Sequence, residues 1–334
     1  MKDRLKSNRP LKIIVTVMAV ILILVVGLTI VSHAVYHRSN MATLSEAFLR
    51  ISGTTSKFED AEKCAAYIET RRNAAPYTLD VEVKSEVSEE MMNGSLIYTL
   101  DPSGAPDYII LYLHGGAYVN DANANYFRIC DRLAQELNAE IIFPIYPLAP
   151  SHAWNETYAL LEQLYRNRLA DAEAPVIIMG DSAGGGLSVA FCEYLSEAGL
   201  PQPDKLILFS PWMDVSMSNP DAAHYEKADP MLSAYGLIEM GKCWANGLDL
   251  QDYRISPIFG DISCLNNVFL FVGTREIFYP DVTRFYEMLR EQNSSAELFV
   301  GEGLNHVYPL YPIPEAEEAL KQVCAIIQAD QSAH

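Results

Sequence analysis

The sequence predicts an α/β protein with a mostly parallel central sheet and helices on both faces. Short apolar segments such as "VIIMG" (176–180) and "VFLFVG" (268–273) alternate with longer amphipathic stretches along most of the chain. Segments this short and this uniformly apolar are typical of strands buried on both faces, and a helix between successive strands is the connection that parallel pairing requires. The chain has 334 residues, half of them apolar, which is enough for one large domain.

The expected elements follow one another in a regular order. Two alternating segments come first, "LDVEVKSEV" (79–87) and, after the Asn93-Gly94 turn signal, "SLIYTL" (95–100), and we expect them to form the antiparallel start of the sheet. Buried strands are expected at 108–113, 140–146, 176–180, 205–210, 268–273 and 296–301. Helices are expected between them at 126–137, 153–168, 185–198 and 281–291, with a last helix from about Glu315.

The N-terminus predicts a membrane anchor. Ile13–Val31 contains nineteen residues without a charge or a proline, which matches a hydrocarbon core of about 30 Å at ~1.5 Å per residue. We expect a transmembrane helix at 13–32 behind a cytoplasmic basic tip at 1–12, with the rest of the chain on the far side of the membrane. A cleaved signal peptide is the alternative, because the small residues Ser32 and Ala34 suit a cleavage site and would release a secreted protein.

Charge is unevenly distributed along the chain. The formal net charge is −19, which argues against nucleic acid as a partner. Five basic residues against one acidic residue give the first twelve positions +4, so the remainder carries −23. After the anchor, residues 41–75 are expected to form two helical segments broken at Gly53.

The six cysteines are far apart and form no C-x-x-C pair, so no metal site is predicted. We expect most of them to be buried free thiols and assign them no function. They are Cys64, Cys130, Cys192, Cys243, Cys264 and Cys324.

Ser182 is a candidate nucleophile. It lies between the buried strand "VIIMG" and a predicted helix, with Gly180 two residues before it and Gly184 two residues after it. In such a G-x-S-x-G turn the glycines let strand and helix approach closely, and the hydroxyl is held at the carboxyl edge of the sheet. A glycine-rich turn that cradles a phosphate is the alternative, although no lysine follows the glycines.

A second glycine-containing turn follows the strand at 108–113. Successive glycines after His114 leave backbone N–H groups that can point toward a ligand at the same sheet edge. The N–H groups of Gly115 and Gly116, with that of Ala183, are therefore predicted to bind the oxyanion of an acyl-transfer reaction. His114 itself is expected to brace the loop.

A serine nucleophile needs a general base, and His306 is the candidate. It is the one histidine in the loop after the last predicted strand, within "FVGEGLNHVYPLYP". The order serine, acid, histidine along the chain is the order that this type of sheet enzyme uses.

These residues resemble the hormone-sensitive-lipase-like branch of the α/β-hydrolases. "HGGA" (114–117), "GDSAGG" (180–185) and "NHVYP" (305–309) match its oxyanion loop, nucleophile elbow and histidine segment, and "DPML" (229–232) and "SPIFG" (256–260) look like further landmarks. The resemblance runs from about Tyr77 to Ala329. It implies an α/β-hydrolase domain at 76–330 whose site the N-terminal helices help to cap.

The triad acid departs from the family pattern, in which an aspartate stands in D-P-L-x-D. This chain reads "GTREIFYPD" (273–281), and Glu276 stands three residues past the glycine that ends the strand, where the family aspartate falls. The predicted triad is Ser182, Glu276 and His306, with Asp281 as the alternative acid. Asp181 is expected to accept hydrogen bonds that brace the turn.

The resemblance implies a serine carboxylesterase or deacetylase that acts on a small ester without a cofactor. Two other functions stay open. One is an amidase or peptidase with the same triad. The other is a non-catalytic protein that keeps the fold to dock a partner.

Overall fold

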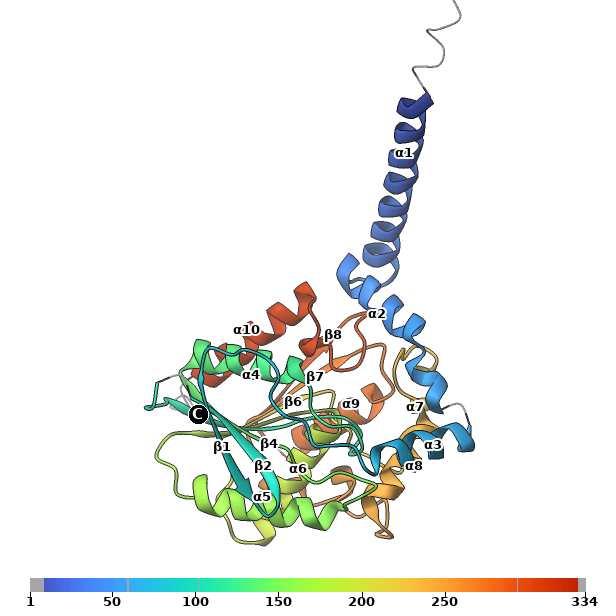
Figure 1. Ribbon diagram of the computed structural model, residues 1–334. Coiled ribbons are helices and arrows are strands. Elements are labelled where there is room, and N and C mark those ends of the chain that lie inside the picture. The colour runs from blue at the N-terminus through green and yellow to red at the C-terminus, as the bar shows by residue number, and fades with distance from the viewer. Residues whose placement is uncertain (1–8, 59, 102, 293, 330–334) are drawn as a thin grey trace, which may run out of the picture.

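The computed structural model describes residues 9–58, 60–101, 103–292 and 294–329. The first eight residues of the predicted basic tip therefore lie outside the described residues. The body is built on one eight-stranded sheet with the strand order β1-β2-β4-β3-β5-β6-β7-β8. The pairs β1–β2 and β2–β4 are antiparallel, and every later pair is parallel. The predicted α/β class and the mostly parallel sheet are confirmed (Figure 1).

Seven of the eight strands fall where the apolar segments predicted them. The strands are β1 (Glu86–Met92), β2 (Ser95–Asp101), β3 (Tyr108–Leu113), β4 (Ala139–Pro144), β5 (Val176–Asp181), β6 (Lys205–Phe209), β7 (Val268–Gly273) and β8 (Ala296–Gly301).

The strand expected at 79–87 is wrong for most of its length, because pairing begins only at Glu86. Its alternating Leu79, Val81 and Val83 pack against a buried apolar cluster without joining the sheet. The backbone N–H groups of Lys84 and Ser85 donate to Asp131 instead of to a neighbouring strand. Alternation therefore marked a face packed on the core, and such a face does not require a strand partner.

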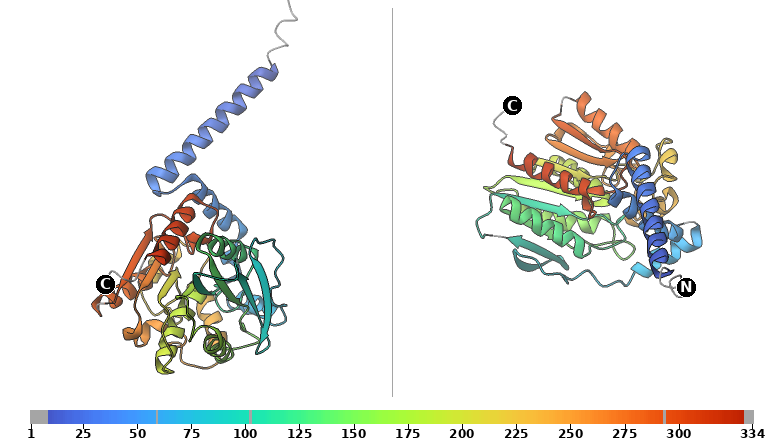
Figure 2. Two further views of the ribbon diagram at one scale, coloured as in Figure 1. Left: turned by 90° about the vertical axis from the view of Figure 1, so that its left-hand side faces the viewer. Right: turned by 90° about the horizontal axis from the view of Figure 1, so that it is seen from above.

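Helices cover both faces of the sheet (Figures 1 and 2). One face carries α4 (Ala124–Leu137) and α10 (Pro314–Gln328), and the other carries α5 (Trp154–Arg168), α6 (Ser182–Glu197), α8 (Ala234–Ala245) and α9 (Tyr279–Glu291). A short helix, α7 (Ala222–Glu226), precedes α8.

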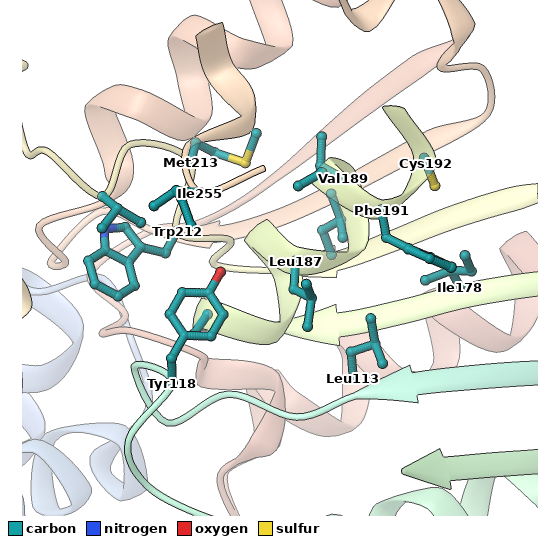
Figure 3. Packing of buried hydrophobic residues seen from close by; sticks show 14 of the residues in the cluster. Leu113, Tyr118, Ile178, Leu187, Val189, Phe191, Cys192, Trp212, Met213 and Ile255 are labelled. Carbon is teal, nitrogen blue, oxygen red and sulfur yellow. The ribbon is translucent and has the colours of Figure 1, made fainter. Parts of the chain in front are cut away.

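The pleat divides each central strand between two apolar cores. Leu111 of β3 and Ile178 of β5 face the core beneath α6, whereas Ile110 and Ile177 face the core beneath α4 and α10. Figure 3 shows the first of these cores. Period-2 alternation between two buried faces is why these strands read as uninterrupted apolar runs.

The N-terminal part begins with a long apolar helix, α1 (Arg9–Ile30), which continues through a π-helical turn at Val31–Val35. The segment Lys12–Val35 is long and apolar enough to cross a membrane, and none of its most apolar window is buried against the body. In Figures 1 and 2 it projects away from the body. A signal sequence would share this length and composition.

The two predicted N-terminal helices are α2 (Asn40–Ser52) and α3 (Ala61–Arg71). The first ends at Gly53, whose φ of 66° forms the left-handed cap that the sequence suggested. Both helices contact the loops at the carboxyl ends of the strands. Arg50 of α2 donates to the carbonyl oxygen of Ala228, and Tyr67 of α3 donates to the side chain of Asn120.

Candidate active site

Ser182 lies at the junction of β5 and α6 with a φ of 51°. This left-handed conformation is uncommon for a residue other than glycine and turns the chain sharply from strand into helix. The turn is possible because position 184 is a glycine, where a Cβ would clash with the carbonyl oxygen of Leu113. Close approach of α6 to β3 therefore explains the second glycine of the motif. The side chain of Ser182 is held at the carboxyl edge of the sheet.

His306 lies beside Ser182. Its Nε2 is 2.9 Å from the Oγ of Ser182, and the two residues are brought together across 124 positions of sequence. The imidazole is buried and its ring packs edge-on against Phe278 at a centroid distance of 5.1 Å. The predicted nucleophile and base are thus at hydrogen-bonding distance.

Glu276 approaches the other ring nitrogen of His306. Its Oε1 is 3.4 Å from Nδ1, and its Oε2 accepts hydrogen bonds from the hydroxyl of Ser210 at 2.7 Å and from the N–H of Gly273 at 3.1 Å. The carboxylate is fully buried. Ser210 also accepts a hydrogen bond from the N–H of Val307 at 2.9 Å, so one hydroxyl joins the carboxylate to the loop that carries the histidine.

Asp281, the alternative acid, lies in the first turn of α9. Its Oδ1 accepts a hydrogen bond from the side-chain amide of Asn219 at 2.7 Å. No hydrogen bond joins Asp281 to His306 in the described part of the chain. Burial raises the pKa of Asp281 to about 6.

Asp229, in the "DPML" segment, is a buried carboxylate that the sequence did not suggest as a site residue. It accepts hydrogen bonds from the N–H groups of Met231, Leu232 and Ile277 at 2.8–3.0 Å. Because Ile277 follows Glu276, Asp229 holds the backbone beside the acid. Burial raises the pKa of Asp229 to about 6.

The electrostatic surroundings of His306 favour its protonated form. Burial alone would lower the pKa of its imidazole. The hydrogen bond and negative charge of Glu276 outweigh burial, and the charges of Asp229 and Asp181 act in the same direction. The net result is a pKa raised above its usual value of 6.5.

The loop after β3 lies beside the Ser182 turn, but the Gly115 N–H is not directed at an incoming oxyanion. It donates to Oδ1 of Asp181 at 2.9 Å. For the backbone N–H groups of Gly116, Ala117 and Ala183, the described residues supply no hydrogen-bond partner. The geometry therefore does not support the predicted role of Gly115, because its N–H serves the turn.

Asp181 accepts the hydrogen bonds that brace this turn, as predicted. Besides the Gly115 N–H, the hydroxyls of Tyr126 and Tyr112 donate to it at 3.0 and 3.3 Å. Burial raises the pKa of the carboxyl to about 6, and these donors limit the rise.

His114 is fully buried and stacks on Tyr146 at a centroid distance of 4.4 Å. Its Nδ1 lies 2.7 Å from the carbonyl oxygen of Gly115, and burial lowers the pKa of the ring. It braces the loop, as the sequence suggested.

The six cysteines are free thiols. Three of them, Cys64, Cys130 and Cys192, are buried and the other three are half-buried, so the prediction that most would be buried is wrong. Within the described ranges, no cluster of three or more His, Cys, Asp or Glu side chains could hold a metal ion.

The N-terminal helix α3 reaches this loop through Asn120. The hydroxyl of Tyr67 donates to Oδ1 of Asn120, while the Asn120 backbone N–H donates to the Gly116 carbonyl oxygen at 2.8 Å. Phe58, just before α3, packs against Gly236 of α8. Ser182 itself is only 7 % exposed.

Comparison with known proteins identifies the class of this fold and site. Residues 110–310 match the family model of the alpha/beta hydrolase fold, and the chain belongs to this family. The matched region begins in β3 and includes the turns of Ser182, Glu276 and His306.

The curated relatives include ester hydrolases. The chain is 28 % identical to an esterase of Acinetobacter venetianus over 221 residues, which cover 64 % of this chain and 73 % of the relative. It is 25 % identical to an acetyl-hydrolase of Streptomyces hygroscopicus over 223 residues, which cover 66 % and 75 % of the two chains.

Solved structures extend the likeness over most of the chain. An esterase candidate from Staphylococcus aureus has a TM-score of 0.77 and 30 % identity, with 82 % of this chain and 95 % of that chain covered. A hormone-sensitive lipase from a metagenome library has a TM-score of 0.72 and 26 % identity, with 86 % and 97 % covered. The resemblance to the hormone-sensitive-lipase-like branch is confirmed.

Proposed function

We propose that this protein is a serine hydrolase that cleaves carboxylic esters, with Ser182, His306 and Glu276 as its catalytic triad. The distance of 2.9 Å between Nε2 of His306 and Oγ of Ser182 is the observation that carries the proposal. A nucleophile within hydrogen-bonding reach of a base, with a carboxylate at the other nitrogen of that base, is the arrangement that acyl transfer requires.

In the first half of the reaction, the Oγ of Ser182 attacks the ester carbonyl carbon while its proton passes to Nε2 of His306. The carbonyl electron pair moves onto the oxygen and gives a tetrahedral oxyanion. His306 then returns the proton to the alcohol oxygen as the carbon–oxygen bond breaks, and the alcohol leaves. Water repeats the sequence on the acyl-enzyme, releases the acid and restores Ser182.

The oxyanion needs hydrogen-bond donors already aimed at it. The N–H groups of Gly116, Ala117 and Ala183 suit this role, because they lie beside the Ser182 turn and the Gly115 N–H is used by Asp181. Loss of one such donor costs about 3 kcal/mol of transition-state stabilisation in comparable sites.

Glu276 serves as the acid of the triad. Its Oε1 faces Nδ1 of His306, so the proton of the neutral ring sits on Nδ1 and Nε2 is left to accept. The hydroxyl of Ser210 and the Gly273 N–H fix the second carboxylate oxygen and thereby orient the first. Asp281 is hydrogen-bonded to Asn219, which supports Glu276 over Asp281 as the acid.

Esters are favoured over amides because the relatives named above are an esterase and an acetyl-hydrolase. A non-catalytic docking role is disfavoured by the short contact between nucleophile and base. The buried site and the acetyl-hydrolase relative favour short acyl groups.

For localisation, we propose that residues 13–32 anchor the protein in a membrane with the basic tip at 1–12 in the cytoplasm. The α/β-hydrolase domain at 76–330 and its cap helices at 41–75 then lie on the opposite side. The exposed apolar surface of α1 and the basic residues before it support this orientation.

The test of the proposed function is hydrolysis of p-nitrophenyl esters of rising acyl length by the purified full-length chain. Ser182→Ala and His306→Ala should each lower kcat by about 10⁴-fold or more while the fold is kept. Ser196→Ala and His152→Ala are matched controls, since Ser196 is exposed near the end of the same helix and His152 lies on the surface. Near-normal turnover by a folded Ser182→Ala variant would remove Ser182 as the nucleophile.

A further inference from the structure

The helix α2 presents an apolar stripe to the outside of the molecule. Met41 and Leu44 are each 50 % exposed, Phe48 is 71 % exposed and Ile51 is 85 % exposed. The steps of three, four and three residues between them place all four on one face of the helix. A helix on a water-covered surface normally shows its polar face to solvent. The helix α2 instead shows an apolar face to the outside.

The inward face of the same helix combines a small apolar residue with a carboxylate. Ala42 and Glu46 are its buried residues, and Glu46 is bonded to three arginines, Arg38, Arg50 and Arg275. These ion pairs hold the pKa of Glu46 down at about 2 in spite of its burial. The side of α2 that carries Glu46 is therefore bonded to the body, and the four apolar side chains on its other side are left half or more exposed.

A hydrogen bond joins α2 to the end of the apolar helix α1, because the side-chain amide of Asn40 donates to the hydroxyl of Thr29 at 3.1 Å. Only a short segment separates the two, and it is docked on the body. Arg38 donates to the carbonyl oxygen of Gly303 at 2.7 Å, and both the N–H and the hydroxyl of Ser39 donate to Glu315. In Figure 1, α2 follows directly after the body-side end of α1. Ile30, Val31 and Val35, near that end, are also exposed.

We propose that α2 is an interfacial helix that seats its apolar stripe in the lipid bilayer into which α1 inserts. The proposal rests on the membrane anchoring proposed above. An exposed apolar helix face next to the end of a membrane span meets lipid at the boundary between headgroups and acyl chains, about 5–10 Å deep. The stripe consists of Met41, Leu44, Phe48 and Ile51.

A second copy of the chain fits this face less well. Four side chains on one short helix offer far less than the roughly 800 Å² per partner that a stable protein interface buries. A partner in water would also have to bind next to the end of the proposed membrane-spanning helix. The bilayer into which α1 is proposed to insert would already lie beside this face of α2.

The experiment is fluorescence quenching of the full-length chain in nanodiscs made with brominated or ordinary phosphatidylcholine. Phe48→Trp places an indole in the stripe, and the emission of the parent chain, which contains Trp154, Trp212 and Trp244, is subtracted. Bromine on the acyl chains should remove about half or more of the added emission, because an interfacial side chain lies within reach of it.

The control is Gln163→Trp, an exposed position on α5. In Figures 1 and 2 this helix lies on the opposite side of the body from α1, so its added emission should be the same in both lipids. Equal quenching at both positions, or none in Phe48→Trp, overturns the proposal. So does an added emission in Phe48→Trp that is blue-shifted, insensitive to bromine and dependent on protein concentration, which would identify a second copy as the occupant.

The outcome does not depend on catalysis. The same quenching is expected in a Ser182→Ala background, and a chain without esterase activity would still show it. Conversely, an active esterase whose Phe48→Trp variant is unquenched would retain the proposed function and lose the interfacial helix.

Discussion

Individual carboxylates around His306 have different roles because their partners differ. Glu276 faces the imidazole, Asp229 holds the backbone after it, and Asp281 is bonded to an amide on another loop. All three are buried, so burial alone does not distinguish the triad acid. The distinguishing feature is the 3.4 Å approach of a carboxylate oxygen to Nδ1.

Replacing these acids by their amides should separate their roles. We expect Glu276→Gln to lower kcat by about 10³- to 10⁴-fold, because the imidazole loses the charge that fixes its tautomer and stabilises its protonated form. Asp281→Asn should change kcat less than about tenfold, since it does not contact the histidine. Steady-state kinetics on one short ester, with circular dichroism as the folding control, measures both. The reverse order of the two effects would make Asp281 the acid.

The acid limb of the pH–rate profile should report the raised pKa of His306. The base acts in its neutral form, so kcat/KM should rise with pH through a value above 6.5. The charge of Asp229 contributes to that rise in pKa, and Asp229→Asn should therefore move the acid limb to lower pH. Asp252→Asn removes a carboxylate far from the histidine in sequence and bonded to Arg254, and it should leave the limb in place. An unmoved limb in Asp229→Asn would contradict the electrostatic role.

The sequence singled out Ser182 and His306 because each stands in a pattern that depends on local backbone: a turn between strand and helix, and the loop after the last strand. It did not single out Ser210 or Asp229 as site residues, since only the folded chain brings Ser210 to Glu276 and Asp229 to the N–H of Ile277. The donor positions proposed in the loop after β3 also differ from the predicted ones by one residue. The direction of each N–H depends on dihedral angles that the glycines leave open.

At the level of elements, the helix α2 is held by charge, and this has a measurable consequence. Glu46→Gln leaves the buried Arg38 guanidinium without its carboxylate. We expect a loss of roughly 2–3 kcal/mol in unfolding free energy, below the range for a fully buried pair because Arg50 and Arg275 remain in contact with water. Thermal unfolding at neutral pH measures it. Glu318→Gln, which changes an exposed carboxylate on α10 in the same way, is the control.

The difference in unfolding free energy between the parent chain and Glu46→Gln should depend on pH, because the pKa of Glu46 is lowered in the folded state. A carboxylate with a folded-state pKa of about 2 and a usual value of 4.5 stabilises the fold above 4.5, and the contribution declines as pH falls toward 2. The gap in stability between the parent chain and Glu46→Gln should therefore narrow below about pH 4.5. A gap that is constant with pH would mean that packing, not charge, docks α2.

The junction of β5 and α6 depends on a close approach of backbones. Gly184→Ala would place a Cβ against the carbonyl oxygen of Leu113, and rigid backbone cannot give way cheaply. We expect a loss of about 1–3 kcal/mol or more together with most of the activity, since the helix that begins at Ser182 must shift. Gly247→Ala is a control for a glycine with open space around its Cβ position, although its φ of 90° carries some strain of its own. Full activity of Gly184→Ala would show that the turn tolerates displacement.

Element boundaries show what the sequence could and could not predict. The buried strands could be predicted because β3 to β8 each pack against apolar cores and are therefore rich in apolar residues. The segment 79–87 was misread because its alternating side chains cover the core without pairing, and hydrogen bonds to Asp131 replace the expected ladder. The helix α6 begins at Ser182, three residues earlier than expected, because the glycines that suggested a turn are part of the helix.

The whole molecule combines a body that packs two apolar cores around one sheet with a helix that contributes nothing to either. None of the most apolar window of α1 is buried, whereas the segment directly after it is bonded to the body. The sequence predicted both the body and the apolar helix from the lengths and order of their apolar segments. It could not predict the docking, which depends on the approach of Arg38 to a loop 265 residues away.

Truncation should separate these parts. Removal of residues 1–30 should leave the melting temperature within a few degrees and the hydrolysis of small esters unchanged, because no side chain described in that stretch is buried. Removal of residues 1–52 takes away α2 with Glu46 and should destabilise the body. Differential scanning calorimetry and an ester assay on both truncated chains check this expectation. Equal stability of the two would show that α2 is dispensable.

Protease added to intact cells tests the orientation. Digestion of the body with survival of only α1 and the basic tip is the expected result, since the excess of Lys and Arg precedes the span. A body protected until lysis would reverse the orientation. A secreted product that begins near Val35 would identify the N-terminal segment as a signal peptide.

The docked segment between α1 and α2 determines how such an enzyme would encounter its substrate. A flexible stalk would leave the body free to move relative to the proposed anchor, but Arg38 and Ser39, a few residues after α1, are bonded to the body and leave little free chain between them. Encounters with esters dissolved in the same bilayer then occur by lateral diffusion in two dimensions. The rate of turnover would depend on the surface concentration of the ester in the bilayer. Adding inert lipid to the bilayer would therefore slow the reaction, whereas diluting the vesicles with buffer would not.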